Sequence, residues 1–304
     1  MLKKIDLVDI TWKKIGSENL PNLIKLFSQN PDIDSDIFYE IQDEIWEEGV
    51  CKTSFFLTFP YMVEIAALQP YETAKDLWIY LGMMASTQQI YRELVSNDIL
   101  ILFDKALEFA EEMCINAIVT QKEISSNDAL YLFSSLFSFS KHKFGYMAIS
   151  CYKDDFIGTS LWKCEKNHIN DVTIYDSGIV EYEKSDPQKT ISKVDCDSLK
   201  YKFVTKNNNP WIKFSDIFDE FILNHKPSEP ILSHLKLSKL IVQNGVISDM
   251  PMRFAFSLCG CLLLCNGNID ESNRILHGWD QVICPLCNSK GLFADYWYEF
   301  ESNY

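Results

Sequence analysis

Apolar residues recur at every third or fourth position through most of the first 140 residues, a spacing that is typical of amphipathic helices. With short polar breaks between them, the predicted helices span residues 18–28, 33–49, 54–68, 71–84, 98–117 and 128–139. Pro60 lies inside the third of these and predicts a kink or a restart at Phe59. The same spacing returns further along the chain, in residues 211–224, 231–243, 251–265 and 270–276.

A segment with a different pattern separates the two helical regions. From Phe144 to about residue 206, β-branched and aromatic residues gather in short runs separated by glycine and proline. The strands predicted there are Tyr146–Tyr152, Asp171–Tyr175 and Tyr201–Thr205. Near the end of the chain, residues 282–298 have the pattern of a knuckle with a β-hairpin.

These elements predict a mainly α fold: an α-solenoid or an irregular helical-hairpin stack, with a small β-rich insert and a C-terminal knuckle and hairpin. The sequence has no clean fixed-period repeat, so an irregular helix bundle stays open as an alternative. Three regions are expected, joined as one continuous structural unit. They are an N-terminal helical repeat region, 1–143, a β-rich insert, 144–209, and the C-terminal helices with the knuckle, 210–304.

Composition and charge narrow the range of functions. Of the 304 residues, 47% are hydrophobic and 23% are charged, which is the composition of a folded globular protein. Because 28 Lys and Arg stand against 43 Asp and Glu, the formal net charge is −15. This charge repels nucleic acid and anionic lipid and attracts basic proteins, so neither nucleic-acid binding nor membrane binding is expected.

The compartment follows from three features. Asp6 and Asp9 interrupt the apolar stretch that a signal peptide requires, so none is expected. The longest apolar run covers residues 254–265, well short of the roughly 20 residues that cross a bilayer. Without a secretory signal, the ten cysteines are expected to remain thiols, and the predicted localisation is cytoplasmic.

Cysteine and histidine spacing gives one candidate metal site. Cys284-Pro-Leu-Cys287 has the spacing with which a knuckle turn places two thiolates on one Zn²⁺ ion, and a closed site needs two further ligands. Cys164 and His168, in the β-rich insert, would complete a structural Cys₃His zinc site. A knuckle without metal and a redox pair are the other interpretations of the C-x-x-C motif. Alternative ligands are His277 and three cysteines that fit the apolar face of a helix, Cys259, Cys261 and Cys265.

An acidic run gives the candidate partner-binding residues. Between Pro31 and Gly49 there are eight carboxylates and no lysine or arginine. Helical spacing turns the isoleucines of this segment toward the core and leaves the acids on the outer face. This face either is an ordinary solvated surface or is kept for a basic partner, and the predicted contact residues are Asp36, Glu40, Asp43, Glu44, Glu47 and Glu48.

Motifs of catalysis are missing from the sequence. The five histidines lie outside any H-E-x-x-H pattern, and neither a P-loop nor a G-x-S-x-G elbow is present. The chain is therefore expected not to be an enzyme, although a triad assembled from distant residues stays possible.

The segment from Ile45 to Ala67 resembles bacterial HEAT-like α-solenoid proteins of the polymorphic-toxin immunity type. In that group an H-Q-G turn precedes a V-P-x-L-V-x-L-A helix. Here Glu47-Glu48-Gly49 replaces the turn, and the helix contains Phe59-Pro-Tyr-Met-Val63. Knuckles of the C-P-x-C type, such as Cys284–Cys287, also occur in the group. The resemblance implies an immunity protein that neutralises a cognate toxin.

Charge and resemblance together predict a non-enzymatic protein-binding module whose partner is a basic toxin domain, for example a nuclease, met by the acidic surface. Two alternatives come from other classes. One is a general helical-repeat scaffold that recruits a host protein, and the other is a zinc-dependent enzyme, which would need an open coordination position.

Overall fold

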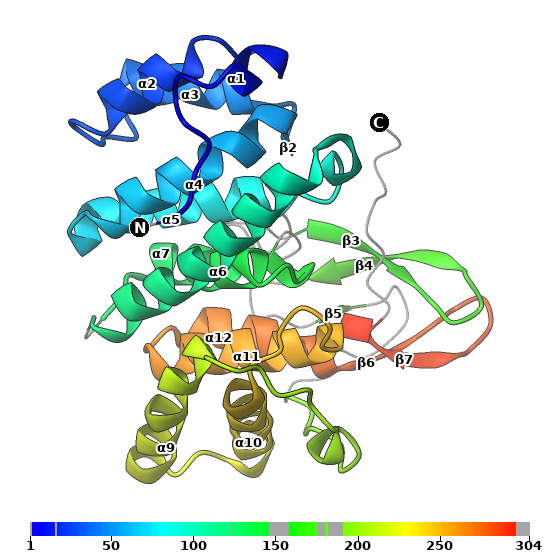
Figure 1. Ribbon diagram of the computed structural model, residues 1–304. Helices are drawn as coiled ribbons and strands as arrows, with labels where there is room; N and C mark the ends of the chain where they lie inside the picture. The colour runs from blue at the N-terminus through cyan, green and yellow to red at the C-terminus, as the bar shows by residue number, and fades with distance from the viewer. Residues whose placement is uncertain are drawn as a thin grey trace. The chain divides into compact units, whose positions relative to one another are not determined.

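The computed structural model describes residues 2–15, 17–121, 123–145, 158–174, 180–181 and 191–295 (Figure 1). The chain forms two compact units. The first consists of Met1–Gln121 with Ser138–Lys141, and the second of Lys122–Phe137 with His142–Tyr304. The three sequence regions are divided by composition and not by contacts, and that division stays a prediction.

The first unit is built from helices and one very short hairpin. Successive helices pack against each other, α2 with α3, α3 with α4, and α4 with both α5 and α6 (Figure 1). Its elements are α1 (Thr11–Lys14), α2 (Leu20–Phe27), α3 (Asp36–Ile45), β1 (Trp46–Glu47), β2 (Val50–Cys51), α4 (Thr53–Ala67), α5 (Tyr71–Ala85), η1 (Arg92–Leu94) and α6 (Asn97–Val119).

Helix α4 is continuous through Pro60, so the predicted restart at Phe59 is wrong. Pro60 is fully within the buried part of the helix, and packing holds the segment helical despite the backbone hydrogen bond that proline cannot make. The aromatic rings of α4 surround Phe103 of α6, with ring centroids 4.7 Å from Phe56 and 4.9 Å from Phe59. These rings form the centre of the first unit's core.

Helix α3 begins as expected and ends earlier. The Ser35 hydroxyl accepts a hydrogen bond from the Phe38 backbone N–H at 3.2 Å, which caps the helix. The helix ends at Ile45 and not at Gly49, because residues 46–51 turn back as the β1–β2 hairpin. Glu48 and Gly49 occupy the turn with positive φ values of 48° and 86°.

The second unit contains helices and two β-hairpins. Helix α7 (Ser126–Phe139) belongs to it except for its last two residues. The other helical elements are η2 (Ser198–Lys200), η3 (Pro210–Lys213), α9 (Phe214–His225), α10 (Glu229–Asn244), α11 (Met252–Cys265), α12 (Ile269–Leu276), η4 (His277–Trp279) and η5 (Phe293–Asp295). Helix α11 is buried along most of its length and packs against α9, α10 and α12.

The strands of the second unit form two antiparallel sheets. β3 (Gly158–Lys163), β4 (Ile169–Ile174) and β5 (Val180–Glu181) form a sheet in the order β3-β4-β5. β6 (Gln281–Ile283) and β7 (Lys290–Leu292) form a hairpin near the C-terminus, as the sequence predicts. The fold is therefore mainly α with a small β insert, which confirms the predicted fold class, while its assignment to the HEAT-like type stays a prediction.

The strand predictions had different outcomes. Asp171–Tyr175 overlaps β4, whereas Tyr146–Tyr152 lies outside the described residues. Tyr201–Thr205 is not a strand, apart from an isolated bridge between Thr205 and Gly245. Its aromatic residues pack instead on helix α11, where the Tyr201 ring lies 5.1 Å from that of Phe254.

Two of the buried histidines in the second unit, His142 and His234, use both ring nitrogens in hydrogen bonds. His142 Nε2 lies 3.0 Å from the Met250 carbonyl oxygen, and the Phe144 backbone N–H donates to His142 Nδ1. His234 Nε2 lies 2.8 Å from the Ser192 carbonyl oxygen, and its Nδ1 lies 2.8 Å from the Ser257 hydroxyl. Both rings therefore use their two nitrogens in the neutral form, with the proton on Nε2.

Close packing of α11 on α12 yields a first prediction. A Cβ at Gly260 would lie 2.6 Å from Leu276 Cδ2 and 2.7 Å from Cγ, closer than atoms tolerate. Gly260→Ala should therefore lower the free energy of unfolding by about 1–3 kcal/mol, measured by urea denaturation. In a Leu276→Ala background the same change should cost less, because the clashing atoms are gone; strictly additive losses would contradict this packing account.

Candidate metal centre

Two hairpins of the second unit end at the same place. The β3–β4 hairpin and the β6–β7 hairpin lie side by side at the right of Figure 1, drawn in green and red. The first carries Cys164 and His168 in its turn, and the second carries Cys284 and Cys287. The structure thus brings together all four residues that the sequence predicts as metal ligands, although about 115 residues separate the pairs.

Local backbone structure places the first pair. Lys163 and Ile169 are the last paired residues of the ladder between β3 and β4, and the Cys164 N–H extends it by donating to the His168 carbonyl oxygen at 3.0 Å. Asn167 closes the turn with a φ of 64° and donates its N–H to the Cys164 carbonyl at 2.8 Å. Asparagine tolerates this left-handed conformation better than most residues, so the sequence favours the turn.

The second hairpin is built in the same way. Ile283 pairs with Lys290, and the Cys284 N–H then donates to the Ser289 carbonyl oxygen at 2.9 Å. Asn288 has a φ of 56°, and its N–H donates to the Cys284 carbonyl at 2.8 Å. Each pair of candidate ligands is therefore held by a rigid turn with an asparagine in the left-handed region.

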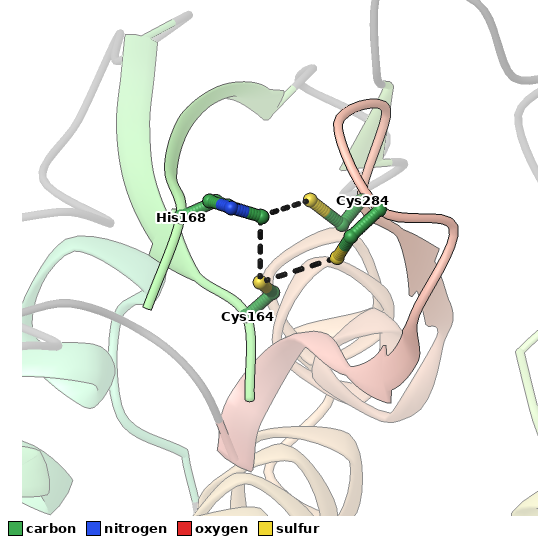
Figure 2. Close-up of side chains that lie close together, drawn as sticks. Cys164, His168 and Cys284 are labelled. Carbon is green, nitrogen blue, oxygen red and sulfur yellow. Dashed lines mark hydrogen bonds between the residues drawn. The ribbon is translucent and has the colours of Figure 1, made fainter. Parts of the chain in front are cut away.

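The four ligand atoms lie within 4.8 Å of one another. Figure 2 shows the side chains of Cys164, His168 and Cys284 pointing toward a common centre. His168 Nδ1 lies 3.6 Å from both Cys164 Sγ and Cys284 Sγ. Cys164 Sγ lies 3.7 Å from Cys287 Sγ, and these cysteines are free thiols.

The three separations of 3.6 and 3.7 Å are close to those between the ligands of a tetrahedral zinc ion. Bond lengths of about 2.3 Å to sulfur and about 2.0 Å to nitrogen place two sulfurs about 3.8 Å apart and a sulfur and a nitrogen about 3.6 Å apart. Three sulfurs and one imidazole nitrogen are also the donor set that zinc prefers. The residues present therefore fit a four-coordinate zinc ion, and with four protein ligands the coordination shell would be closed.

Thiolate formation, which metal binding requires, is favoured at part of the site. The Ser289 hydroxyl, 3.1 Å from Cys287 Sγ, and the Ser289 N–H lower the pKa of Cys287 to about 7. Burial disfavours the thiolate of Cys164, but hydrogen bonds led by the His168 N–H lower the pKa of that thiol. Burial raises the pKa of Cys284, the most enclosed of the three.

The alternative ligands lie elsewhere. His277 Nδ1 is 2.6 Å from Asp280 Oδ2, and both side chains are buried. Cys259 and Cys261 are buried in α11, and burial raises the pKa of both thiols. Among the described residues, only the Cys₃His set brings three or more candidate ligand atoms this close together.

The predicted partner-binding residues lie on and after α3. Asp36, Glu40 and Asp43 are exposed on the helix, and Glu44 is half-buried. Glu47 and Glu48 are exposed in the β1–β2 hairpin, beyond the helix. One cation near this surface was not expected from the acidic run. Lys52 follows strand β2, lies 3.5 Å from Glu47, and donates a hydrogen bond to the Asp43 carbonyl oxygen.

No family model, curated protein or solved structure matches this chain. Within the described parts of the chain, no helix combines the length and hydropathy that crossing a membrane requires. Function must therefore be inferred from the geometry and charge of the chain itself.

Proposed function

We propose that this chain is a non-enzymatic binding protein that uses the acidic surface around α3 to contact a basic protein, and that a structural zinc ion holds its second unit together. The observation that carries the binding proposal is a set of six carboxylates, five of them exposed, that are left largely without neutralising cations in the part of the chain that the structure describes. Among the described residues, Lys52 is the one cation that forms an ion pair with the six candidate acids, and it reaches Glu47 alone.

Helix α3 separates its two faces sharply. Phe38, Ile41 and Ile45 are at most 3% exposed and anchor the helix in the core. Tyr39 is 48% exposed on the acidic side, where an aromatic ring offers apolar contact area to a partner. Like charges one turn apart, as in Glu40 and Glu44, cost a few tenths of a kcal/mol, and a binding surface is a reason to retain them.

Charge determines the class of partner. A net charge of −15 speeds encounter with a positively charged protein and disfavours nucleic acid. A toxin domain of the basic nuclease type has this chemistry, and the resemblance of Ile45–Ala67 to immunity proteins supports that choice. The chain would then neutralise the toxin by covering its active surface.

The metal centre supports a structural role and not a catalytic one. Four protein ligands leave zinc no open position for substrate or water, which a catalytic zinc ion requires. The ion would instead join the β3–β4 hairpin to the β6–β7 hairpin, which belong to two separate small sheets. This closed ligand set favours a binding protein over a zinc-dependent enzyme.

Neutralising the acidic surface should weaken partner binding. In the variant Asp36→Asn/Glu40→Gln/Asp43→Asn/Glu48→Gln, we expect at least a tenfold loss of affinity at low salt and a flatter dependence on salt, because surface charges mainly accelerate association. The partner is first recovered from native cells with the tagged protein, eluted by salt and identified by mass spectrometry. Affinity is then measured with the purified partner by surface plasmon resonance.

The matched control removes four exposed acids elsewhere: Glu93→Gln/Asp98→Asn/Glu108→Gln/Asp197→Asn. It has the same net charge as the test variant and should lose much less affinity. Equal losses in both variants would show that only the net charge matters and not the surface around α3. An unchanged affinity of the test variant would overturn the proposed surface. Recovery of a diverse set of housekeeping proteins, with no basic partner, would favour a scaffold.

A further inference from the structure

A cavity of about 320 Å³ lies in the first unit, between the C-terminal end of α4, the beginning of α5 and the C-terminal end of α6. Its volume is at the lower limit of known ligand pockets and suits a single long side chain. None of the residues that line it carries a charge at neutral pH. The cavity belongs to the first unit and the metal centre to the second.

The walls of the cavity combine apolar and polar side chains. Methyl groups of Ala66, Ala67, Ala74 and Ala117 line it, together with the side chains of Met113 and Trp78. Small methyl groups leave a narrow space that an unbranched aliphatic chain can fill. Leu68, between two lining residues, is 82% exposed and extends this apolar surface outward.

Five polar residues line the cavity, and two of them, Gln69 and Gln121, present acceptors; the others are Tyr71, Asn116 and Thr120. Gln69 Nε2 donates to the Ile65 carbonyl oxygen at 3.2 Å, and Gln121 Nε2 donates to the Ala117 carbonyl oxygen at 3.4 Å. The amide donors are thus directed at helix carbonyls. The Oε1 atoms of Gln69 and Gln121 receive no hydrogen bond from the described residues, so they are available to a ligand that donates.

The electrostatic field at the cavity is negative. Helices α4 and α6 both end there, at Ala67 and Val119, and a helix C-terminus carries about −0.5 of a charge. The positive N-terminus of α5 offsets one of these ends, and the nearby Glu72 and Lys75 are paired at 3.5 Å. Glu112, the neighbour of Met113 in the sequence, is exposed and does not line the cavity.

We propose that this cavity is a binding site for a long cationic side chain, an arginine or lysine of the partner protein. The aliphatic part would lie against the alanine methyl groups, and the cationic head would donate hydrogen bonds to the two glutamine oxygens at the helix C-termini. An anion would face the two glutamine oxygens and the two helix C-termini, and a purely apolar group would leave those oxygens unsatisfied. The proposal rests on the proposed function, because it supplies a second contact for the same basic partner.

The test uses a small probe and does not require the partner. N-acetyl-L-arginine amide is titrated into the full chain carrying ¹³C-methyl alanine and methionine, and the resonances of Ala117 and Met113 are followed by NMR. We expect a saturable shift with a dissociation constant in the millimolar range, as suits a ligand this small. N-acetyl-L-citrulline amide, an uncharged molecule of the same shape, should bind at least fivefold more weakly.

Two variants locate the site. Gln121→Lys places a positive charge at the cavity and should weaken arginine-amide binding at least tenfold, whereas Gln89→Lys makes the same charge change at an exposed position elsewhere in this unit. Absence of saturation, equal binding of citrulline amide, or equal effects of both variants would overturn the proposal. A saturable site in a chain that captures no basic partner would instead overturn the proposed function alone.

Discussion

Replacing both cysteines of the C-terminal knuckle, Cys284→Ser/Cys287→Ser, should abolish zinc binding and destabilise the second unit. We expect the purified wild-type chain to contain one zinc ion and the variant none, measured by plasma mass spectrometry. Because the free energy of binding a structural zinc ion is part of the free energy of folding, the loss should be at least about 3 kcal/mol, or a melting temperature lower by about 6–12 °C. Wild-type protein stripped with a chelator should melt at the same temperature as the variant.

The location of the effect separates a structural metal from an adventitious one. Hydrogen exchange should speed up in the hairpins β3–β4 and β6–β7, with α4 and α6 of the first unit little changed. The matched control is Cys196→Ser, since Cys196 is an exposed thiol outside the cluster, and it should keep both zinc and stability. A wild-type chain without zinc, or a variant that retains it, would contradict the assignment.

Acidification should destabilise the chain well above the pH at which carboxylates protonate. Burial lowers the pKa of His142 and that of His234 to about 4, and the nearby carboxylates Asp249 and Asp280 offset this only in part. Unfolded histidine has a pKa of about 6.5, so the unfolded chain binds protons first as the pH falls. The stability that neutral histidines provide is therefore complete above pH 6.5 and is lost progressively toward pH 4.

The slope gives the size of the effect. Each histidine should contribute up to about 1.4 kcal/mol per pH unit within this window, so the pair contributes up to about 2.7 kcal/mol per unit. Burial is the main source of this penalty. At His142, a proton added to Nδ1 would in addition face the Phe144 N–H, which now donates to that atom.

Denaturation curves between pH 7 and 5, recorded with excess zinc to keep the metal centre loaded, measure this dependence. His142→Gln and His234→Gln should each lower the pH dependence of the free energy of unfolding by up to about 1.4 kcal/mol per pH unit, even if they also change stability at pH 7. His225→Gln is the matched control, because His225 is exposed, and it should leave the slope unchanged. Slopes that stay the same in all three variants would show that the buried rings do not carry the effect.

The metal ligands were predictable from sequence because the two members of each pair lie close together along the chain. C-x-x-C and C-x₃-H each fit a single turn, so each pair could be found without knowledge of the fold. A further local signal was overlooked: Asn167 and Asn288 stand where each turn needs a left-handed residue. That the two hairpins meet depends on how the intervening helices pack, which spacing does not determine.

Other errors arose where packing overrode local preference. Tyr201–Thr205 has the composition of a strand, but its aromatic rings are used against Phe254 and not in a sheet. The helix continues through Pro60 because most of its residues, Pro60 included, are buried in the core. Lys52 falls outside the acidic run in sequence, and only the tight turn at Glu48 and Gly49 brings it back to Glu47.

The cavity of the first unit had no sequence signal at all. Alanines and glutamines are ordinary helix residues, and nothing in their spacing indicates that three helix ends meet. Its two free acceptor oxygens arise because the amide N–H groups of Gln69 and Gln121 donate to helix carbonyls, and those contacts exist only in the folded chain.

The separation of the ligand pairs along the chain sets an order of events during protein synthesis. Cys164 and His168 are made early, but about 120 residues must follow before Cys287 is added. At typical translation rates this takes roughly 6 to 24 s, during which the first hairpin offers only half of a coordination shell. Tight zinc capture would thus be a late step of biogenesis, and a chain that ends within the C-terminal helices would lack two of the four ligands.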